Sequence, residues 1–285
     1  MTNVPNLPDY KEIERKEWTA AAPLWKKWRG KLVAQTRAAT ELLVREARVA
    51  PGMHALDLAS GTGEPALSIA RVVAAHGRVV ATDLVPQMLE AIREYAAAEN
   101  LPQVECRVAD AEQLPFSDAE FDRVTCRFGL MFFPDIQRAL GEIRRVLKPG
   151  GRFSFAVFGS AEENPFFAVT MGPFLRRAKM PPPPPDAPGI FRFADEQKLS
   201  DTLRSAGFGG VHAAKHRVPW PWPGPAEEAW QAMQDLAAPF KKVMAMLPAA
   251  ESGNAVQEVF EGMRRFDRGD SVSFSATVIV ATGVA

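Results

Sequence analysis

Residues 56–66 read Leu-Asp-Leu-Ala-Ser-Gly-Thr-Gly-Glu-Pro-Ala, and the architecture can be inferred outward from them. An apolar strand enters a glycine turn, and the chain leaves it as a helix whose first turn contains Pro65, where a missing N–H costs nothing. The spacing Gly61-x-Gly63-x-x-Ala66 fits loops that bring a nucleotide against the backbone. Asp83 follows about twenty residues later at the end of the next expected strand, where a ribose hydroxyl needs an acceptor. The stretch therefore predicts a nucleotide-type ligand at a strand-to-helix turn.

Strand-like and helix-like segments alternate around this turn. Such alternation is typical of a parallel sheet with crossover helices. The expected strands are His54–Ala59, Arg78–Asp83, Val104–Ala109, Phe121–Arg127, Arg152–Phe158, Val211–Val218 and Ser271–Ala281. The expected helices begin near Glu64, Pro86 and Asp135 and span Asp195–Ala206, Pro225–Leu247 and Ala255–Phe266. We predict an α/β fold: a Rossmann-like, mostly parallel seven-stranded sheet with helices on both faces.

Two segments fall outside this alternation. Residues 10–48 are amphipathic and helical in pattern, with tryptophans among lysines, arginines and glutamates. After Gly159 the chain runs into five consecutive prolines, Pro181–Pro185, a stiff and extended sequence. We expect an N-terminal helical cap segment over residues 1–50 and a main domain over 51–285, with a substrate cap inserted after the fifth strand at about residues 160–192.

The composition limits the kind of partner. Lys plus Arg number 34, Asp plus Glu also number 34, and 47% of the residues are hydrophobic. No global field is therefore available to hold nucleic acid or an anionic membrane surface. We see no secretory leader and no run apolar enough to cross a bilayer, so we expect a cytoplasmic protein. Two cysteines and four histidines form no zinc or disulfide pattern, and no metal is expected.

The charges beside the glycine turn distinguish two kinds of nucleotide. A dinucleotide would place its pyrophosphate at this helix N-terminus, where Asp57 and Glu64 are already negative. Like charges about 4 Å apart repel by about 4 kcal/mol at an effective dielectric of about 20. S-Adenosylmethionine instead carries an ammonium and a sulfonium, which Asp57 would attract, and a carboxylate that helix amides can bind. The charges therefore favour S-adenosylmethionine over NAD.

Further motifs follow the turn in a fixed order. Ala55–Asp57 and the glycine turn are followed by Val80–Leu84, Val108–Phe116, Phe121–Val124, Phe128–Asp135 and Arg145–Gly151. In order and spacing they resemble the class I S-adenosylmethionine-dependent methyltransferases, of the broad group that includes the ubiquinone and menaquinone biosynthesis C-methyltransferases. The resemblance covers the first five expected strands. It implies methyl transfer, for which an enzyme mainly supplies orientation and a dry site.

The resemblance also implies a set of residues that bind the cofactor. Those implied around the methionine portion are Asp57, Ala59, Gly61, Thr62 and Gly63. Those implied around the ribose and adenine are Asp83, Leu84, Met88, Asp110 and Ala111. Arg127 matches a position that contacts cofactor or substrate. All of them fall near carboxyl ends of expected strands, where open α/β sheets bind ligands.

Departures from the family pattern leave the acceptor open. Ala59 stands in place of the usual first glycine, a change also found in quinone methyltransferases. The N-terminal Tyr-Asp and Ser/Trp pattern of the quinone enzymes has no counterpart before Gly52, and Val157 stands where they carry an acid. The insert containing Pro181–Pro185 has no place in them either. The sequence therefore assigns no quinone pathway, catalytic residue or oligomeric state.

Residues outside these motifs bear on the acceptor. The fourth strand continues as Cys126-Arg127-Phe128-Gly129, without the Asp/Asn-Pro-Pro-aromatic sequence of base N-methylation. We favour O- or C-methylation of a small, partly apolar acceptor. The tryptophans of residues 18–28 and the aromatic insert are core candidates that could also wall an apolar pocket. His216 on the sixth strand is either structural or a general base, and Cys106 and Cys126 are expected to be buried free thiols.

Two other functions remain open. An NAD-dependent oxidoreductase would use the glycine turn but has no need of Asp57, Asp110 or the later motifs. A non-catalytic S-adenosylmethionine-binding protein would keep every cofactor residue. Because methyl transfer needs few side chains, the sequence contains no feature that separates this second alternative from an enzyme.

Overall fold

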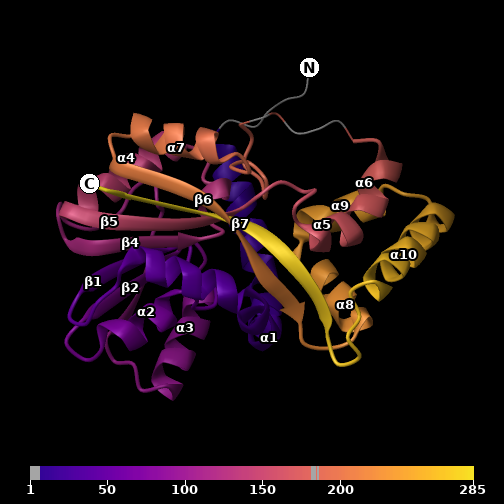
Figure 1. Cartoon of the computed structure of the whole chain (residues 1–285), viewed down its shortest axis with the longest axis horizontal. Helices are drawn as coiled ribbons and strands as arrows, with labels where there is room; N and C mark the ends of the chain where they lie inside the picture. Colours follow the sequence, from indigo (N-terminus) through magenta and orange to yellow (C-terminus); the bar gives the residue numbers. More distant parts are fainter. Residues whose placement is uncertain (1–6, 181–183, 185) are drawn as a thin grey trace.

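The computed structural model describes residues 7–180, 184 and 186–285, and a seven-stranded sheet forms its centre (Figure 1). The strands are β1 His54–Leu58, β2 Arg78–Asp83, β3 Val104–Val108, β4 Phe121–Arg127, β5 Leu147–Phe158, β6 Gly209–Trp222 and β7 Val272–Val284. Their order is β3-β2-β1-β4-β5-β7-β6. Strands β1 to β5 are parallel, and β7 is antiparallel to both its neighbours. The predicted mostly parallel Rossmann-like sheet is confirmed.

Helices cover both faces of the sheet, as predicted. On one face lie α1 Leu7–Ala47, α2 Ala66–Val73 and α3 Pro86–Ala98, and α2 and α3 pack there on residues such as Ala55 and Ala81. On the other face lie α4 Ile136–Val146 and α7 Glu196–Ser205, packed with residues such as Leu56 and Val80. Because side chains alternate along a strand, Ala55 and Leu56 serve opposite faces.

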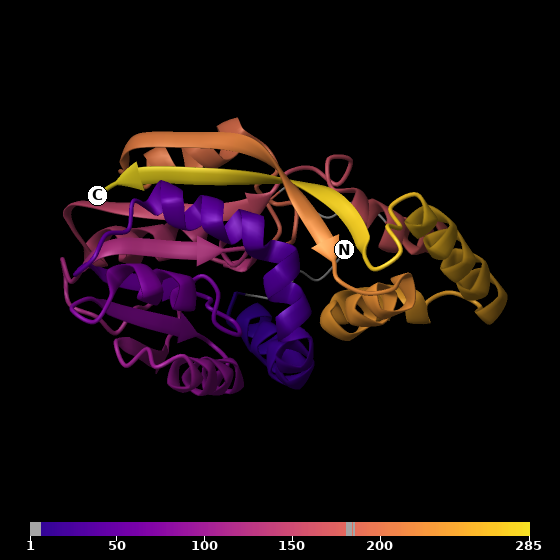
Figure 2. The same cartoon turned by 60° about the horizontal axis from the view of Figure 1, so that its bottom comes forward.

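The N-terminal segment is one helix, α1, of 41 residues. Its second half lies along the sheet, where the backbone carbonyl of Leu43 accepts a hydrogen bond from the buried Ser154 hydroxyl at 3.1 Å. Its first half turns across the carboxyl ends of the strands toward α3, and the bend is visible in Figure 2. There Lys26 forms an ion pair with Glu94 of α3 at 2.6 Å. The helix therefore borders the edge of the sheet where the predicted site lies.

A helical cap stands beside the sheet at the end of a two-stranded arm (Figure 2). The arm forms because β7 pairs with β5 only from Val278 onward, whereas it pairs with β6 from Val272. The cap helices are α5 Pro165–Thr170, α6 Gly172–Ala178, α8 Ala226–Leu236, α9 Ala238–Ala245 and α10 Ala249–Arg264. Arg177 of α6 donates to Glu258 of α10 at 2.8 Å. The cap thus combines the insert after β5 with the connection between β6 and β7.

Several predicted boundaries were wrong, and proline explains three of them. Helix α2 begins at Ala66, with Pro65 as its N-cap rather than inside the first turn. The predicted helix Pro225–Leu247 is two helices, α8 and α9, which break at Ala237, and Pro239 lies in the first turn of α9, where a proline has no N–H to lose to the helix. Strand β6 continues through Pro219 and Pro221, which an edge strand tolerates. Residues 181–183 and 185 of the predicted extended run Pro181–Pro185 lie outside the described residues.

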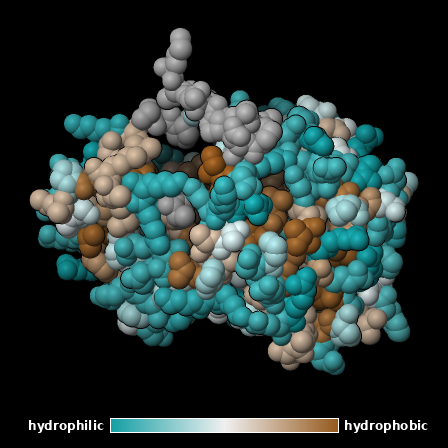
Figure 3. All heavy atoms as spheres, turned by 180° about the vertical axis from the view of Figure 1, so that it is seen from behind, coloured by the Kyte–Doolittle hydropathy of each residue, from teal (hydrophilic) through white to brown (hydrophobic). Residues whose placement is uncertain are grey.

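The surface is mixed in character, and Figure 3 shows one face on which hydrophobic and hydrophilic residues are interspersed. Over residues 7–180, 184 and 186–285, no helix is long and apolar enough to span a membrane. In the same part of the chain, no group of His, Cys, Asp or Glu residues is suited to hold a metal ion. Cys126 is buried and free, as predicted. Cys106 is free but only half-buried, since β3 is an edge strand.

Candidate functional site

The strand order reverses between β1 and β4, which is where open α/β sheets bind ligands at the carboxyl edge. The carboxyl ends of β1 to β4 and the segments that follow them carry the predicted site residues. These are Asp57 in β1, then Ala59, Gly61, Thr62 and Gly63 in the turn after it; Asp83 at the end of β2, then Leu84 and, in α3, Met88; Asp110 and Ala111 after β3; and Arg127 at the end of β4. The fold therefore brings the predicted cofactor residues to one edge of the sheet.

Asp83 holds the glycine turn in place. Its carboxylate accepts the Gly61 N–H at 2.9 Å and the Val85 N–H at 3.0 Å. Within the turn, Ala59 has a φ of 50° and Gly63 a φ of 120°. Both values lie in the region that glycine adopts most easily. Ala59 thus keeps the backbone conformation that a glycine at this position would take, at some cost in strain.

Asp57 places an unpaired acceptor at the end of β1. The side chain is fully buried, and its Oδ1 accepts the Thr125 hydroxyl at 2.6 Å. Its Oδ2 is buried and has no hydrogen-bond partner. Burial raises the pKa of this carboxyl to about 7, and Arg127 opposes the shift. A ligand that donates to Oδ2 with a positive charge would satisfy the atom and favour the ionised carboxylate.

Arg127 places an unpaired donor at the end of β4. Its Nη1 donates to the hydroxyls of Thr36 and Thr40 on α1, each at 2.6 Å. Its Nε is buried without a partner, and burial lowers the pKa of the guanidinium. Over the described ranges, the buried side-chain atoms without a partner are Trp25 Nε1, Gln35 Nε2, Asp57 Oδ2 and Arg127 Nε. Unpaired buried polar atoms are expensive, so their concentration at this edge and on the helix that borders it indicates a ligand site.

Glu64 occupies the N-terminus of α2. Its side chain is buried, and Oε2 accepts the Ser68 hydroxyl at 2.6 Å and the Ser68 N–H at 3.3 Å. A pyrophosphate bound in the dinucleotide manner would need these helix N–H groups and would meet this carboxylate. The Glu64 carboxylate therefore lies where a pyrophosphate would bind, as the prediction against NAD requires.

The residues after β2 and β3 form the side on which we expect the adenine. Met88 is buried and clusters with Ala22 and Val85, with Trp25 of α1 packed against them. Leu84 is 37% exposed. Asp110 is already paired, since it accepts from Lys11 of α1 at 2.7 Å and from the Glu112 N–H at 2.9 Å. Ala111 is buried beside it.

Helix α1 contributes residues to this edge that the sequence analysis missed. Lys11 pairs with Asp110, and Arg29 donates from Nε to the Thr62 carbonyl of the glycine turn at 2.8 Å. Arg29 is 9% exposed. It lies on the buried face of α1, four residues after Trp25 and seven before Thr36. A cation on a face whose other buried residues are uncharged was the signal that could have identified it.

Aromatic side chains gather where β4, β5 and β6 end. Phe128 follows Arg127 with a φ of 60° and stacks on Phe158 with ring centroids 4.2 Å apart. Trp220 of β6 meets both rings edge to face, at 5.9 Å and 5.5 Å. A bulky residue held at positive φ is strained, and such residues concentrate at functional sites. We call Phe128, Phe158, Phe167 and Trp220 the aromatic cluster, since Phe167 of α5 completes it at 5.0 Å from Phe158.

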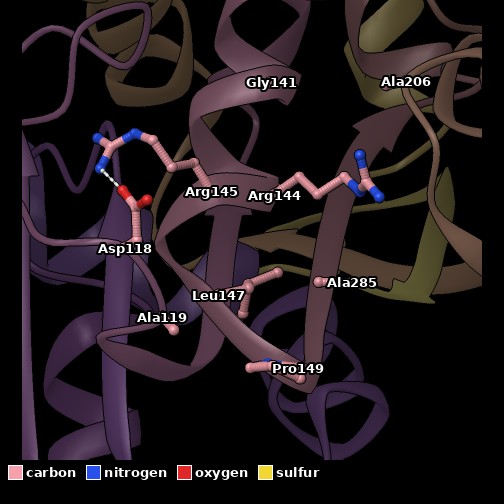
Figure 4. A pocket seen from close by; sticks show the side chains of 9 residues that line it. All are labelled: Asp118, Ala119, Gly141, Arg144, Arg145, Leu147, Pro149, Ala206 and Ala285. Carbon is pink, nitrogen blue, oxygen red and sulfur yellow. Dashed lines mark hydrogen bonds and ion pairs between the residues drawn. The ribbon is translucent and has the colours of Figure 1, made fainter.

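Two other features lie away from the glycine turn. His216 is on β6, which β7 separates from β5, so it is about 10 Å from the β5 backbone at the usual strand spacing. The surface pocket in Figure 4 lies at the opposite, amino edge of the sheet and is lined by residues such as Asp118, Pro149 and Ala285. Figure 4 shows Arg144 and Arg145 pointing in opposite directions there, with Arg145 bound to Asp118. The two guanidinium groups therefore do not converge on a ligand.

Strand order, the glycine turn and the acidic residues after β1, β2 and β3 together define a class I methyltransferase. The chain belongs to the ubiE/COQ5 methyltransferase family, whose family model matches residues 24–175. The predicted family resemblance is thereby confirmed.

Curated relatives match the methyltransferase core of the chain. The chain is 40% identical over 134 residues to a demethylmenaquinone methyltransferase of Symbiobacterium thermophilum, and the match covers 47% of this chain and 49% of that protein. It is 44% identical over 109 residues to a ubiquinone/menaquinone biosynthesis C-methyltransferase of Bordetella avium, covering 38% of this chain and 42% of the relative. The matches thus span about half the length of these relatives or less.

Among solved structures, the fold is similar to that of the YcgJ protein from Bacillus subtilis. The TM-score is 0.56 at 20% identity, and the match covers 86% of this chain and 97% of that one. At this identity the likeness concerns the fold, and it extends over most of the chain.

Proposed function

We propose that the chain is an S-adenosylmethionine-dependent methyltransferase that acts on a small, partly apolar acceptor at oxygen or carbon. The observation that carries the proposal is the pair of unpaired buried atoms beside the glycine turn, Asp57 Oδ2 and Arg127 Nε. One accepts and the other donates, which suits the ammonium and carboxylate of an amino acid. Membership of the ubiE/COQ5 methyltransferase family supports the same ligand.

The residues present fit this cofactor, which supplies an electrophilic methyl group on a sulfonium. Asp57 would bind the ammonium, and the glycine turn would lie along the amino-acid chain. Asp83, already fixed by the Gly61 and Val85 N–H groups, would accept the ribose hydroxyls with its remaining lone pairs. Met88 and Trp25 would cover the adenine side. Asp110 would reach the adenine amino group if Lys11 shares or releases its carboxylate.

The aromatic cluster supports an apolar acceptor. Phe128 adjoins Arg127 in the chain and carries its ring at the end of β4 next to Phe158 and Trp220. These residues would orient a flat, apolar acceptor and keep water out. The names of the curated relatives make a demethylated naphthoquinol the first acceptor to assay. The match to them is partial, and a phenol belongs in the same panel.

The first test is thermal unfolding with S-adenosylmethionine, S-adenosylhomocysteine and NAD in parallel. A ligand at about 100 times its Kd should add about 2.7 kcal/mol of stability, a shift of several degrees. We expect the shift with both adenosyl sulfur ligands and none with NAD. A shift with NAD alone would replace this proposal by an oxidoreductase, against which the position of the Glu64 carboxylate argues.

The second test separates an enzyme from a non-catalytic binding protein. Transfer of labelled methyl from S-adenosylmethionine would be measured with a naphthoquinol, a phenol and a primary amine. We expect turnover with one of the first two. Cofactor binding without turnover of any of the three would favour the non-catalytic alternative.

A further inference from the structure

The first half of α1 brings a buried cation to the glycine turn. The Nε of Arg29 donates to the Thr62 carbonyl at 2.8 Å. The guanidinium also lies over the ring of Tyr95, 3.6 Å from its centroid. In the part of the chain that the structure describes, Arg29 forms no ion pair with a carboxylate, although it is only 9% exposed. A buried guanidinium without an anion retains most of its desolvation penalty.

Arg127 approaches the same place from the sheet. Its Nη1 is bound to Thr36 and Thr40, while its buried Nε has no partner. Thr36 follows Arg29 by seven residues, so the two lie on the same side of α1 about two turns, or about 10.5 Å, apart. Burial and the positive charge of Arg29 both lower the pKa of Arg127. Arg127 ends the strand that pairs with β1, and Arg29 contacts the glycine turn that follows β1, so the two guanidinium groups border the same turn.

The acids near these cations are engaged with other groups or left for a bound ammonium. Glu64 and Asp57 both attract Arg127. The Glu64 carboxylate, however, is bound to Ser68 and approached by Arg71. Asp57 offers one unpaired oxygen, which a bound ammonium would take. An anion placed between Arg29 and Arg127 would relieve their repulsion and satisfy the Nε of Arg127.

We propose that Arg29 of α1 and Arg127 of β4 together bind the α-carboxylate of the cofactor. This inference rests on the proposed function and adds to it a residue from outside the strand-end motifs. It makes α1 part of the cofactor site as well as a support for the glycine turn. Arg29 thereby contributes to the affinity for the amino-acid end of the ligand and not for the nucleoside.

The test compares two ligands that differ by the carboxylate alone: S-adenosylhomocysteine and its decarboxylated analogue S-adenosyl-3-thiopropylamine. Dissociation constants would be measured by calorimetry on the whole chain and on Arg29→Met. In the wild type we expect the carboxylate to tighten binding ten- to hundredfold, as hydrogen bonds to a charged group do. In Arg29→Met the tightening by the carboxylate should be at least threefold smaller than in the wild type, because only Arg127 remains, and Arg29→Lys should fall between.

The controls separate a ligand contact from a structural effect. Arg37 is an exposed arginine on the same helix, so Arg37→Met should keep the wild-type ratio. If Arg29→Met weakens both ligands equally, Arg29 only holds the glycine turn and the inference is wrong. Equal binding of the two ligands by the wild type also overturns it. If neither ligand nor S-adenosylmethionine binds the wild type, the proposed function fails instead.

Discussion

At the residue scale, Asp57 is the group whose chemistry depends most on its surroundings. Its carboxyl is fully buried beside Thr125, and the charges of Arg127 and Glu64 act on it in opposite directions. Burial raises its pKa from 3.8 to about 7, so near neutral pH it is poised between protonated and ionised forms. A bound ammonium would shift this balance toward the ionised form. Burial in the folded protein therefore favours the protonated carboxyl, whereas a bound ammonium favours the ionised carboxylate.

Asp57 should make both stability and binding depend on pH. Because its folded pKa is raised, its contribution to stability is fully present below pH 3.8 and is lost as pH rises to about 7. Relative to Asp57→Asn, the wild type should lose up to about 4 kcal/mol of unfolding free energy over that interval and none above it. Affinity for S-adenosylhomocysteine should rise through pH 7 in the wild type only. Urea unfolding and calorimetry between pH 5 and pH 8 would check both, and parallel pH profiles for the two proteins would contradict the assignment.

A second residue-scale feature is the contact between Ala59 and Gly129. A Cβ added at Gly129 would lie 2.6 Å from the Ala59 Cβ and 2.9 Å from the Cys126 Sγ. Gly129→Ala should therefore destabilise the fold by about 1–3 kcal/mol through overpacking. Adding Ala59→Gly should recover part of the loss, because it removes the nearer atom and suits the φ of 50° at that position. Thermal unfolding of the two single variants and the double variant would measure the coupling between the two positions. If the two changes in unfolding free energy simply added, the contact would not be the cause.

At the element scale, the strands and their end residues followed from local pattern. Strand β2 was predicted with its observed limits, and Asp83 lies where the spacing from the glycine turn placed it. The contacts of α1 could not be predicted in the same way. Arg29 meets Thr62 across 33 residues of sequence, and Lys11 meets Asp110 across 99. Helical period identifies the buried face of α1 but not the strand ends that this face covers.

The full extent of the cap could not be predicted from the sequence, because it too depends on long-range contacts. Residues 226–264 have helical pattern, but no local feature shows that they pack beside the insert after β5. That placement depends on β6 and β7 pairing beyond the end of β5, a long-range property. The sequence therefore predicts the helices of the cap better than the position of the cap.

The aromatic cluster yields a prediction at this scale. Phe128→Ala removes a ring that stacks on Phe158 and meets Trp220, without touching Asp57 or Asp83. We expect KM for the acceptor to rise at least several-fold while the Kd for S-adenosylhomocysteine stays within about twofold. Phe260→Ala, a half-buried change on α10, provides the matched control and should leave both constants unchanged. If Phe128→Ala instead weakened the cofactor and spared the acceptor KM, the cluster would belong to the cofactor side.

At the scale of the whole molecule, the two long strands connect the cap to the sheet. β6 and β7 pair with each other from the amino edge of the sheet, beside β5, to the base of the cap. The rings of Trp28 on α1 and Trp222 on β6 lie 5.6 Å apart, and the Trp28 indole donates to Asp235 of α8 at 2.8 Å. The N-terminal helix thus contacts the cofactor edge, the sheet and the cap. An apolar acceptor between cap and sheet would meet walls from all three parts.

This continuity predicts that cap and core unfold as one unit. β6 and β7 belong to both the sheet and the arm that carries the cap. Urea unfolding followed by far-UV circular dichroism should therefore coincide with unfolding followed by tryptophan fluorescence. The fluorescence reports on Trp18, Trp25 and Trp28 of α1 and on Trp220, Trp222 and Trp230 of the arm and cap. S-Adenosylhomocysteine, bound at the glycine turn, should raise the midpoint of both signals equally. Trp28→Phe keeps much of the packing but removes the hydrogen bond to Asp235, so it should lower one common midpoint. Two separated transitions, with only the core transition responding to the ligand, would show instead that the cap is an independent unit whose position the cofactor does not stabilise.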